Sequence, residues 1–408
     1  MILFLTVVVV LYGRRLTPEE RITVLRTIIS RARQWSVIAW RFITRTPEGC
    51  EDFFAALRAR TRWTFITPAL IATFVIAHFV MKWNSTSEVD EQLLLHWGGS
   101  IGPRTTNGEW WRLATAMFVH WGWLHLIADA AGLVMVGLLV ERLVGPVAFS
   151  VVYIASGLLA ALWGLSAHPV SVTAGAAGAV FGIYGLLLAT LVWGLVQRSA
   201  VTIPIRALKR LWPGALLFLV YNMATEGFLG ESMEAGLVVG FVSGSILAAR
   251  ISADKPPMRR VWAMMAATVV IVVALAAPLR GMADVTGEIA RVIEVEGRTA
   301  AAYDAQVERF KKGRISAEAL AMIASDIGVE LHTIRTALAT LTHVPEAHQQ
   351  LLADASEYLR LREDSWRLRV EGLRSGRMPT LQRAERLESD ALTAFEKVEK
   401  LKSGKVEK

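Results

Sequence analysis

The stretch TAGAAGAVFGIY, residues 173–184, is dominated by small residues and opens a long apolar run. Apolar residues continue to about residue 195, which gives the roughly 20 residues that a helix needs to cross a bilayer. Small residues on one helix face let membrane helices approach closely. That face is formed by Gly175, Gly178, Gly182 and Gly185. The stretch therefore predicts a tightly packed, membrane-embedded helix.

Composition places the whole chain among membrane proteins with extramembrane parts. Of its 408 residues, 53% are hydrophobic and only 20% are charged, a balance that is wrong for a soluble globular protein. The single cysteine, Cys50, excludes an intrachain disulfide. The net charge of +8 is concentrated between Gly13 and Arg62, where there are eleven arginines and no lysine. These arginines flank membrane segments, which favours a topological role and a lipid contact over nucleic-acid binding.

Seven segments are long and apolar enough to be spanning helices. They are about 63–82, 113–140, 146–165, 174–195, 212–229, 233–250 and 261–279. Connections on one side carry nearly all of the basic residues, whereas those on the other contain only Arg104 and Arg112. Because basic residues collect on the cytoplasmic side, the N-terminal region is predicted to be cytoplasmic and the C-terminal region extracytoplasmic. In a bacterium, this is a multi-pass protein of the inner membrane.

The predicted fold class is all-α: a polytopic membrane helix bundle with an extramembrane helical domain. The predicted parts are 1–62, a hydrophobic segment and a basic amphipathic cytoplasmic region; 63–250, a six-helix membrane core; 251–280, a linker and a seventh span; and 281–408, an extracytoplasmic domain. The first twelve residues are too short to span comfortably, so an interfacial anchor and a partial span both remain open. The last part mixes charges of both signs around apolar stripes, which predicts about four helices in a coiled-coil-like bundle.

Several short motifs follow one another in the predicted core. They are GEWWR (108–112), HWGWLHLIAD (120–129), GLLVERLVG (137–145), GAAG (175–178) and MEAGLVVGFVSG (233–244). In this order and spacing they resemble the rhomboid family of intramembrane serine proteases. The resemblance implies a six-helix core and structural roles for Glu109, Trp111, Arg112, His120, Glu141, Gly175, Gly178, Gly236 and Gly240.

The resemblance also shows what this chain lacks. In the family, a serine in Gly-x-Ser-Gly attacks the peptide bond and a histidine on the last core helix removes its proton. The corresponding residues here are Ala177 and Met233. An alanine methyl cannot attack a carbonyl, and a thioether cannot take up a proton near neutral pH. Both members of the catalytic pair are therefore missing.

The oxyanion position is altered as well. The family's His-x3-Asn pair corresponds to His125 and Asp129. An ionised aspartate only accepts hydrogen bonds, so it would repel a developing oxyanion. The two residues are one helical turn apart, which favours a pair between them. Rearranged catalysis through Ser171, Thr173, Glu234 or His168, and a metal site at His120, His125 and Asp129, are weaker alternatives.

We therefore expect a rhomboid-like pseudoprotease that binds transmembrane segments of other membrane proteins without cutting them. No cofactor, metal or nucleic acid is expected. Residues 281–408 are expected to contact a protein partner or a second copy of the chain. Two alternatives remain: an active serine-type endopeptidase with a non-standard site, and a membrane anchor whose working part is the C-terminal helical domain.

Overall fold

The structure of the chain is a computed structural model, which describes residues 26, 30, 34, 46–83, 89–196, 203–227, 230–248 and 256–402. Across these residues the chain is helical, and the only β-pairing found among them is an isolated antiparallel bridge between Ser100 and Thr173. The all-α fold class is confirmed. The predicted N-terminal anchor and amphipathic region lie almost entirely outside the described residues.

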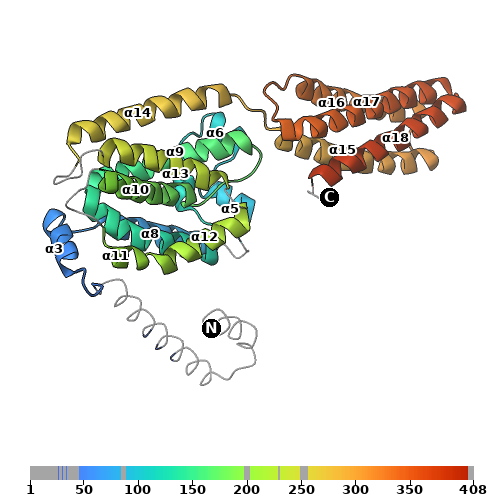
Figure 1. The fold of residues 1–408 in the computed structure, drawn as a ribbon. Coiled ribbons are helices and arrows are strands. Elements are labelled where there is room, and N and C mark those ends of the chain that lie inside the picture. The colour runs from blue at the N-terminus through green and yellow to red at the C-terminus, as the bar shows by residue number, and fades with distance from the viewer. Residues whose placement is uncertain are drawn as a thin grey trace.

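Within the described residues, seven apolar helices make up the membrane core, and they lie side by side (Figure 1). They are α4 (Ile66–Trp83), α8 (Trp123–Val144), α9 (Pro146–Ala167), α10 (Ala177–Val196), α12 (Trp212–Glu226), α13 (Glu231–Ala248) and α14 (Met258–Ala276). Five of them, counting α14 with the following turn, are long and apolar enough to cross a bilayer. Within the described residues, α12 has 15 residues and the apolar part of α13 covers Met233–Leu247, so these two are shorter.

One predicted span begins in the wrong place. Residues assigned to the start of the 113–140 segment instead form α7 (Arg112–Thr115) and the 3-10 turn η1 (Ala116–Phe118). The backbone is extended at Val119 and Gly122, which separates this turn from the spanning helix. The helix itself starts at Trp123. Apolarity alone cannot reveal such a break, because the buried turn is as apolar as the helix that follows.

Short helices close the two ends of the core. On one end lie α5 (Glu91–His96) and α6 (Gly102–Thr106), and on the other lie α3 (Glu51–Arg60) and α11 (Ile205–Lys209). Arg112 is the anchor of the first group. It is buried, ion-paired with Glu109, and its guanidinium donates to the carbonyls of Leu95 and Gly99, the latter at 2.9 Å. These bonds use the Nε and Nη1 donors of the guanidinium and fix the loop around the start of α7.

The centre of the core is the crossing of α10 with α13, where two glycine faces meet. A Cβ on Gly236 would lie 2.3 Å from the carbonyl oxygen of Gly178, and one on Gly240 would lie 1.9 Å from that of Gly182. The two backbones are therefore in direct contact. Such closeness gives dispersion contacts along the helices and allows weak Cα–H···O bonds.

Glu141 ties the first span to the second. Its buried carboxylate accepts hydrogen bonds from the backbone amides of Phe65, Ile66 and Thr67 at 2.8–2.9 Å. It also accepts one from the Thr67 hydroxyl at 2.8 Å. A helix start leaves amides without intrahelical partners and favours negative charge. Glu141 therefore acts as the N-terminal cap of α4 from a neighbouring helix.

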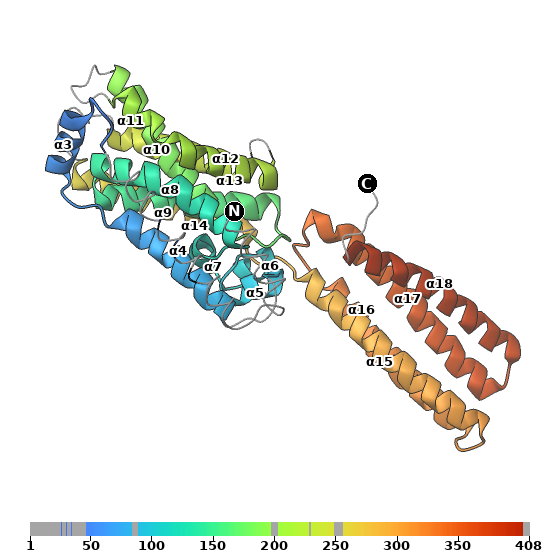
Figure 2. The ribbon, with the colours of Figure 1, turned by 90° about the horizontal axis from the view of Figure 1, so that it is seen from below.

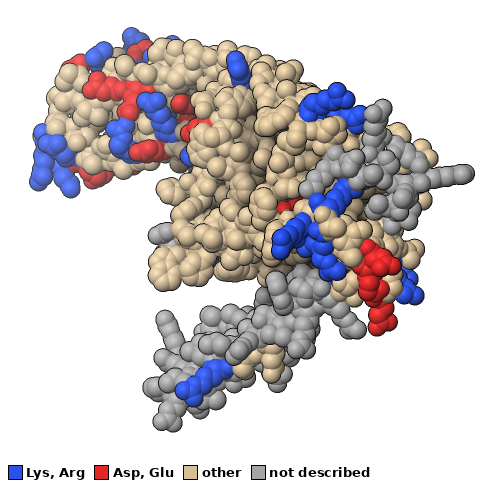
Figure 3. Space-filling model, turned by 90° about the vertical axis from the view of Figure 1, so that its left-hand side faces the viewer, with Lys and Arg blue, Asp and Glu red and all other residues tan. Residues whose placement is uncertain are grey.

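Side-chain chemistry at the ends of the core fits a membrane. Exposed tryptophans lie near both ends of the helices: Trp63, Trp212 and Trp262 at one, and Trp83, Trp123 and Trp163 at the other. Tryptophan is enriched at membrane–water interfaces. The first of these ends also carries many of the basic side chains and faces the viewer in Figure 3. The C-terminal helices leave from the opposite end (Figure 1).

The C-terminal helices form a bundle that projects away from the core (Figure 2). They are α15 (Val285–Lys311), α16 (Ala317–Ala339), α17 (Glu346–Ser375) and α18 (Met378–Lys402). Gly313, Pro345 and the SGRMPT stretch lie at the breaks between them, and the predicted number of about four helices is confirmed. The Asn107 side chain donates to the carbonyl of Met282 at 2.8 Å, which joins the base of this bundle to the loops of the core.

A charged network is buried inside this bundle. Arg362 is almost fully buried and pairs with Glu296 at 2.9 Å and with Glu388, which also pairs with Arg369. Tyr358 donates to Glu296. Burial disfavours the charge of Glu388, but its bond to Arg369 and the charge of Arg362 outweigh this, so its pKa is lowered. Each charge thus has partners, as buried charges require.

Candidate functional site

A cavity of about 860 Å³ opens among the spanning helices. Its walls come from α9, from the start of α10, from α12 and from the loop before α10. The lining includes Ala177, Gly178, His125 and Tyr221. The structure therefore brings the position predicted for the nucleophile and one of the predicted oxyanion residues to a single cavity.

Ala177 is the first residue of α10 and one of the cavity-lining residues. The chain reaches it through Gly175, whose φ of +131° is one that side chains rarely adopt. A Cβ at Gly175 would also come within 2.6 Å of the His125 ring. This tight turn explains why glycine is required before the helix. Only the methyl group of Ala177 stands at the helix start, and a methyl has no nucleophilic atom.

Met233 lies in the first turn of α13 and is buried. It belongs to the same apolar cluster as Ala177 and Phe181. Three residues further along, Gly236 touches the backbone of Gly178. The helix expected to carry a base therefore lies against the helix expected to carry a nucleophile, but its side chain here adds apolar packing and no proton acceptor.

Asp129 has a role that the sequence only partly predicted. It is fully buried, and its Oδ2 accepts a hydrogen bond from the backbone amide of Ala176 at 2.8 Å. The Nε2 atoms of His120 and His125 lie 3.3 and 3.5 Å from the same oxygen. The pair with His125 is found, and His120 joins it. The carboxylate thus stands at the start of α10, where a helix favours negative charge.

Tyr221 was not identified from the sequence. It lies on α12 and its ring stacks on that of His125, with centroids 5.2 Å apart and planes at 24°. Tyr184, on α10, donates to the carbonyl of Gly132 at 3.0 Å. Both residues look like ordinary aromatic residues of membrane helices in the sequence, so no local pattern marks them.

The alternative catalytic groups lie in different places. Ser171, Thr173 and His168 all contribute to the cavity lining, in the loop before α10. Thr173 is held there by the bridge to Ser100, with N···O distances of 2.9 and 2.8 Å. Glu234 is exposed on α13 and does not line the cavity. Among the described residues, no group of three or more His, Cys, Asp or Glu side chains is arranged to hold a metal ion.

The site is thus a cavity among the spanning helices of a polytopic membrane protein. It is lined by the start of α10, where Gly178 also contacts Gly236 of α13. The Rhomboid domain family matches residues 107–254. A putative rhomboid protease, YdcA of Bacillus subtilis (strain 168), is 31% identical over 138 residues, covering 32% of this chain and 68% of that protein. The chain therefore belongs to the rhomboid family.

Two further relatives cover less of their own length. Rhomboid protease GluP of Bacillus subtilis (strain 168) is 27% identical over 189 residues, which are 46% of this chain and 35% of GluP. Inactive RHOMBOID-like protein 8 of Arabidopsis thaliana is 31% identical over 156 residues, which are 37% of this chain and 41% of that protein. Relatives named as proteases and a relative named as inactive are thus both similar to this core.

Proposed function

We propose that this chain is a rhomboid pseudoprotease that binds transmembrane segments of other membrane proteins and does not cleave them. The observation that carries the proposal is the residue at the start of α10. Ala177 lines the cavity at the place where the rhomboid resemblance requires a serine. Without a hydroxyl at this place and with Met233 on the facing helix, the nucleophile and its base are both lacking.

Asp129 supports the same conclusion through electrostatics. A protease must stabilise negative charge that develops on the substrate carbonyl. Here the Ala176 amide already binds a carboxylate at 2.8 Å. A negative charge that develops on the substrate beside an ionised Asp129 would be repelled. The Nε2 atoms of His120 and His125 lie against Asp129 as well, at 3.3 and 3.5 Å, so they face this carboxylate. Restoring the serine would leave this opposing charge in place.

The retained scaffold supports binding. The cavity is large enough for several side chains, and its α9 wall is made of small residues: Gly157, Ala160, Ala161 and Gly164. Small residues allow another helix to approach closely within lipid. The partner expected at this wall is therefore a transmembrane segment of a client protein, in contact with both the cavity and the lipid.

Site-specific photocrosslinking tests the binding proposal. A photoreactive residue at Ala161, in the cavity wall, is expected to capture membrane proteins through their transmembrane segments. The matched control is the same residue at Ala267, which is exposed on α14. Equal capture from the two positions, or capture of lipid alone at Ala161, would contradict a client site in the cavity.

We also propose a bacterial inner-membrane location with the N-terminal region in the cytoplasm and the α15–α18 bundle outside. The basic end of the core and the bundle lie at opposite ends, which supports this orientation under the positive-inside rule. Topology reporters fused after Arg62 and after Lys408 test it. A cytoplasmic signal from the second fusion would overturn the proposed orientation.

A further inference from the structure

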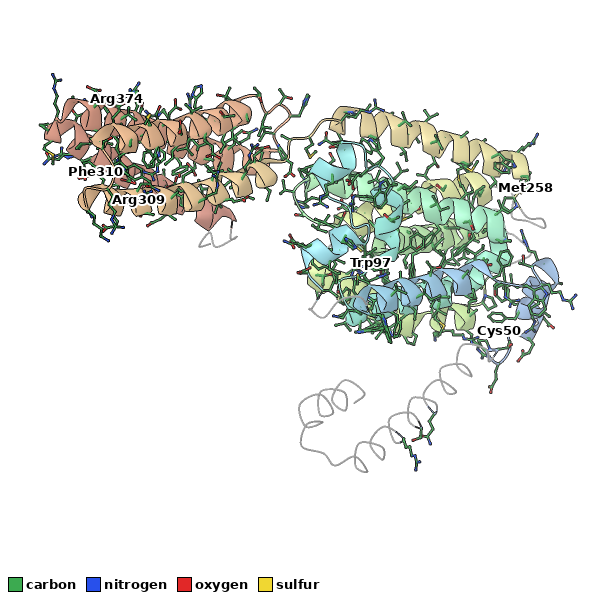
Figure 4. The ribbon with its side chains drawn as sticks, turned by 180° about the vertical axis from the view of Figure 1, so that it is seen from behind. Cys50, Trp97, Met258, Arg309, Phe310 and Arg374 are labelled. Atoms are coloured by element: carbon green, nitrogen blue, oxygen red, sulfur yellow. The ribbon has the colours of Figure 1, made fainter. Side chains whose placement is uncertain are left out.

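Basic side chains gather at the far end of the C-terminal bundle. Both helical hairpins turn there: α15 into α16 through residues 312–316, and α17 into α18 through residues 376–377. We call this surface the distal tip, and define it by Arg309, Phe310, Lys311, Lys312, Arg314, Arg374, Arg377 and Met378, all of which are exposed. Figure 4 shows Arg309, Phe310 and Arg374 together at this end.

The charge of the distal tip is only partly neutralised. Lys311 pairs with Glu308 at 2.9 Å, and Arg374 pairs with Glu318 at 3.0 Å. Arg309 donates to a neutral group, Gln306, at 3.0 Å. Within the part of the chain that the structure describes, no ion pair is found for the remaining cations, which are Lys312, Arg314 and Arg377. The tip therefore presents excess positive charge to the solvent.

Two apolar side chains stand among these cations. Phe310 is 37% exposed and Met378 is 62% exposed. Phe310 lies between Arg309 and Lys311 in the chain, and Met378 follows Arg377. Exposed apolar residues flanked by lysine and arginine are the combination that enters the interface of an anionic bilayer. An acidic protein surface could pair with the basic side chains, but its binding would be strengthened less by the exposed Phe310.

The position of the distal tip determines which bilayer it can contact. The bundle continues in the direction of the spanning helices in both ribbon views (Figures 1 and 2). Its α16 and α17 have 23 and 30 residues, which correspond to lengths of roughly 35 and 45 Å. The tip therefore points away from the membrane that holds the core. We propose that the distal tip docks on the anionic phospholipid surface of a second, facing membrane, so that the chain bridges two bilayers.

A vesicle-bridging experiment tests this proposal with the full chain. The protein is reconstituted in phosphatidylcholine vesicles and mixed with labelled acceptor vesicles of phosphatidylcholine, with or without phosphatidylglycerol. Co-flotation with acceptors is expected only when they are anionic, and it should weaken as salt is raised. Replacing Arg309, Lys311, Lys312 and Arg314 by glutamine should lower it at least about tenfold.

Two further variants make the result specific. A control variant, in which glutamine replaces three exposed cations outside the distal tip, is expected to leave bridging unchanged. These cations are Arg291 on α15 and Arg386 and Lys397 on α18. Phe310→Ser, which keeps the charge, is expected to weaken it. The arginine-rich N-terminal region is the same in every variant, so it cannot cause the differences. Equal bridging by the tip variant and the control, or equal binding to neutral acceptors, would overturn the proposal, as would wild-type protein that binds no vesicles at all.

Discussion

Replacing Gly240 by alanine tests the crossing that organises the core. The new methyl carbon would stand 1.9 Å from the carbonyl oxygen of Gly182 and 2.6 Å from its carbonyl carbon. Both are backbone atoms, so no side chain can rotate away. Ordinary contact begins at 3.4 Å, and the two helices must therefore separate along the whole glycine face.

The size of the effect follows from overpacking. Inserting a methyl group into a well-packed core costs about 1–3 kcal/mol, and the gain in helix propensity from glycine to alanine returns about 1 kcal/mol at most. We expect Gly240→Ala to be destabilising, and Gly240→Leu to be more so. Thermal unfolding of the purified protein in detergent, followed by tryptophan fluorescence, measures the change.

Matched substitutions exclude general effects of added bulk. Gly194 lies on α10, and nothing stands within 4 Å of a Cβ built there. Gly194→Ala is therefore expected to leave the melting temperature unchanged or slightly raised. For the larger side chain, Ala267→Leu on the exposed face of α14 is the control. If Gly240→Ala and Gly194→Ala have the same melting temperature, the crossing is not tightly packed and the reasoning fails.

Three other outcomes are expected. Glu141→Ala leaves the start of α4 without its acceptor and should cost at least about 1–3 kcal/mol, seen as a lower melting temperature than that of Glu234→Ala, an exposed control. Ala177→Ser alone should create neither cleavage of a model transmembrane substrate nor labelling by a fluorophosphonate probe, because Met233 supplies no base. Activity from this single change would refute the claim that the site lacks a base. In the bundle, the lowered pKa of Glu388 stabilises the folded state above the carboxyl's ordinary pKa of about 4.3, and this contribution is lost as the pH falls below it. Acid titrations followed by circular dichroism should therefore show a smaller loss below about pH 4.3 for Glu388→Gln than for the wild type.

Much of the membrane core could be predicted because its determinants are local in the sequence. The small residues of 173–184 predicted a tightly packed helix, and Gly178 and Gly182 of α10 do contact Gly236 and Gly240 of α13. The breaks at Gly313 and Pro345 fall between helices. These features depend on residue size, backbone freedom and periodicity, which a sequence displays directly.

Other features depend on contacts between distant segments and could not be predicted. The start of α8 was misplaced because the turn before it is apolar and buried. Glu141 caps a helix more than 70 residues earlier in the chain. The stacking of Tyr221 on His125 joins two helices about 100 residues apart. Such partners are set by the packing of the helices. The resemblance implied a structural role for Glu141 but did not identify the helix that it caps, and no local pattern marks Tyr221.

The most direct test of the central claim is a cleavage assay on the wild-type chain. Purified protein in lipid vesicles is incubated with a model transmembrane substrate and, in parallel, with a serine-reactive fluorophosphonate probe. An active rhomboid protease in the same vesicles serves as the positive control. The absence of a nucleophile at Ala177 and of a base at Met233 predicts neither cleavage products nor labelling. Cleavage together with labelling at any residue of the wild-type chain would contradict the assignment as a pseudoprotease.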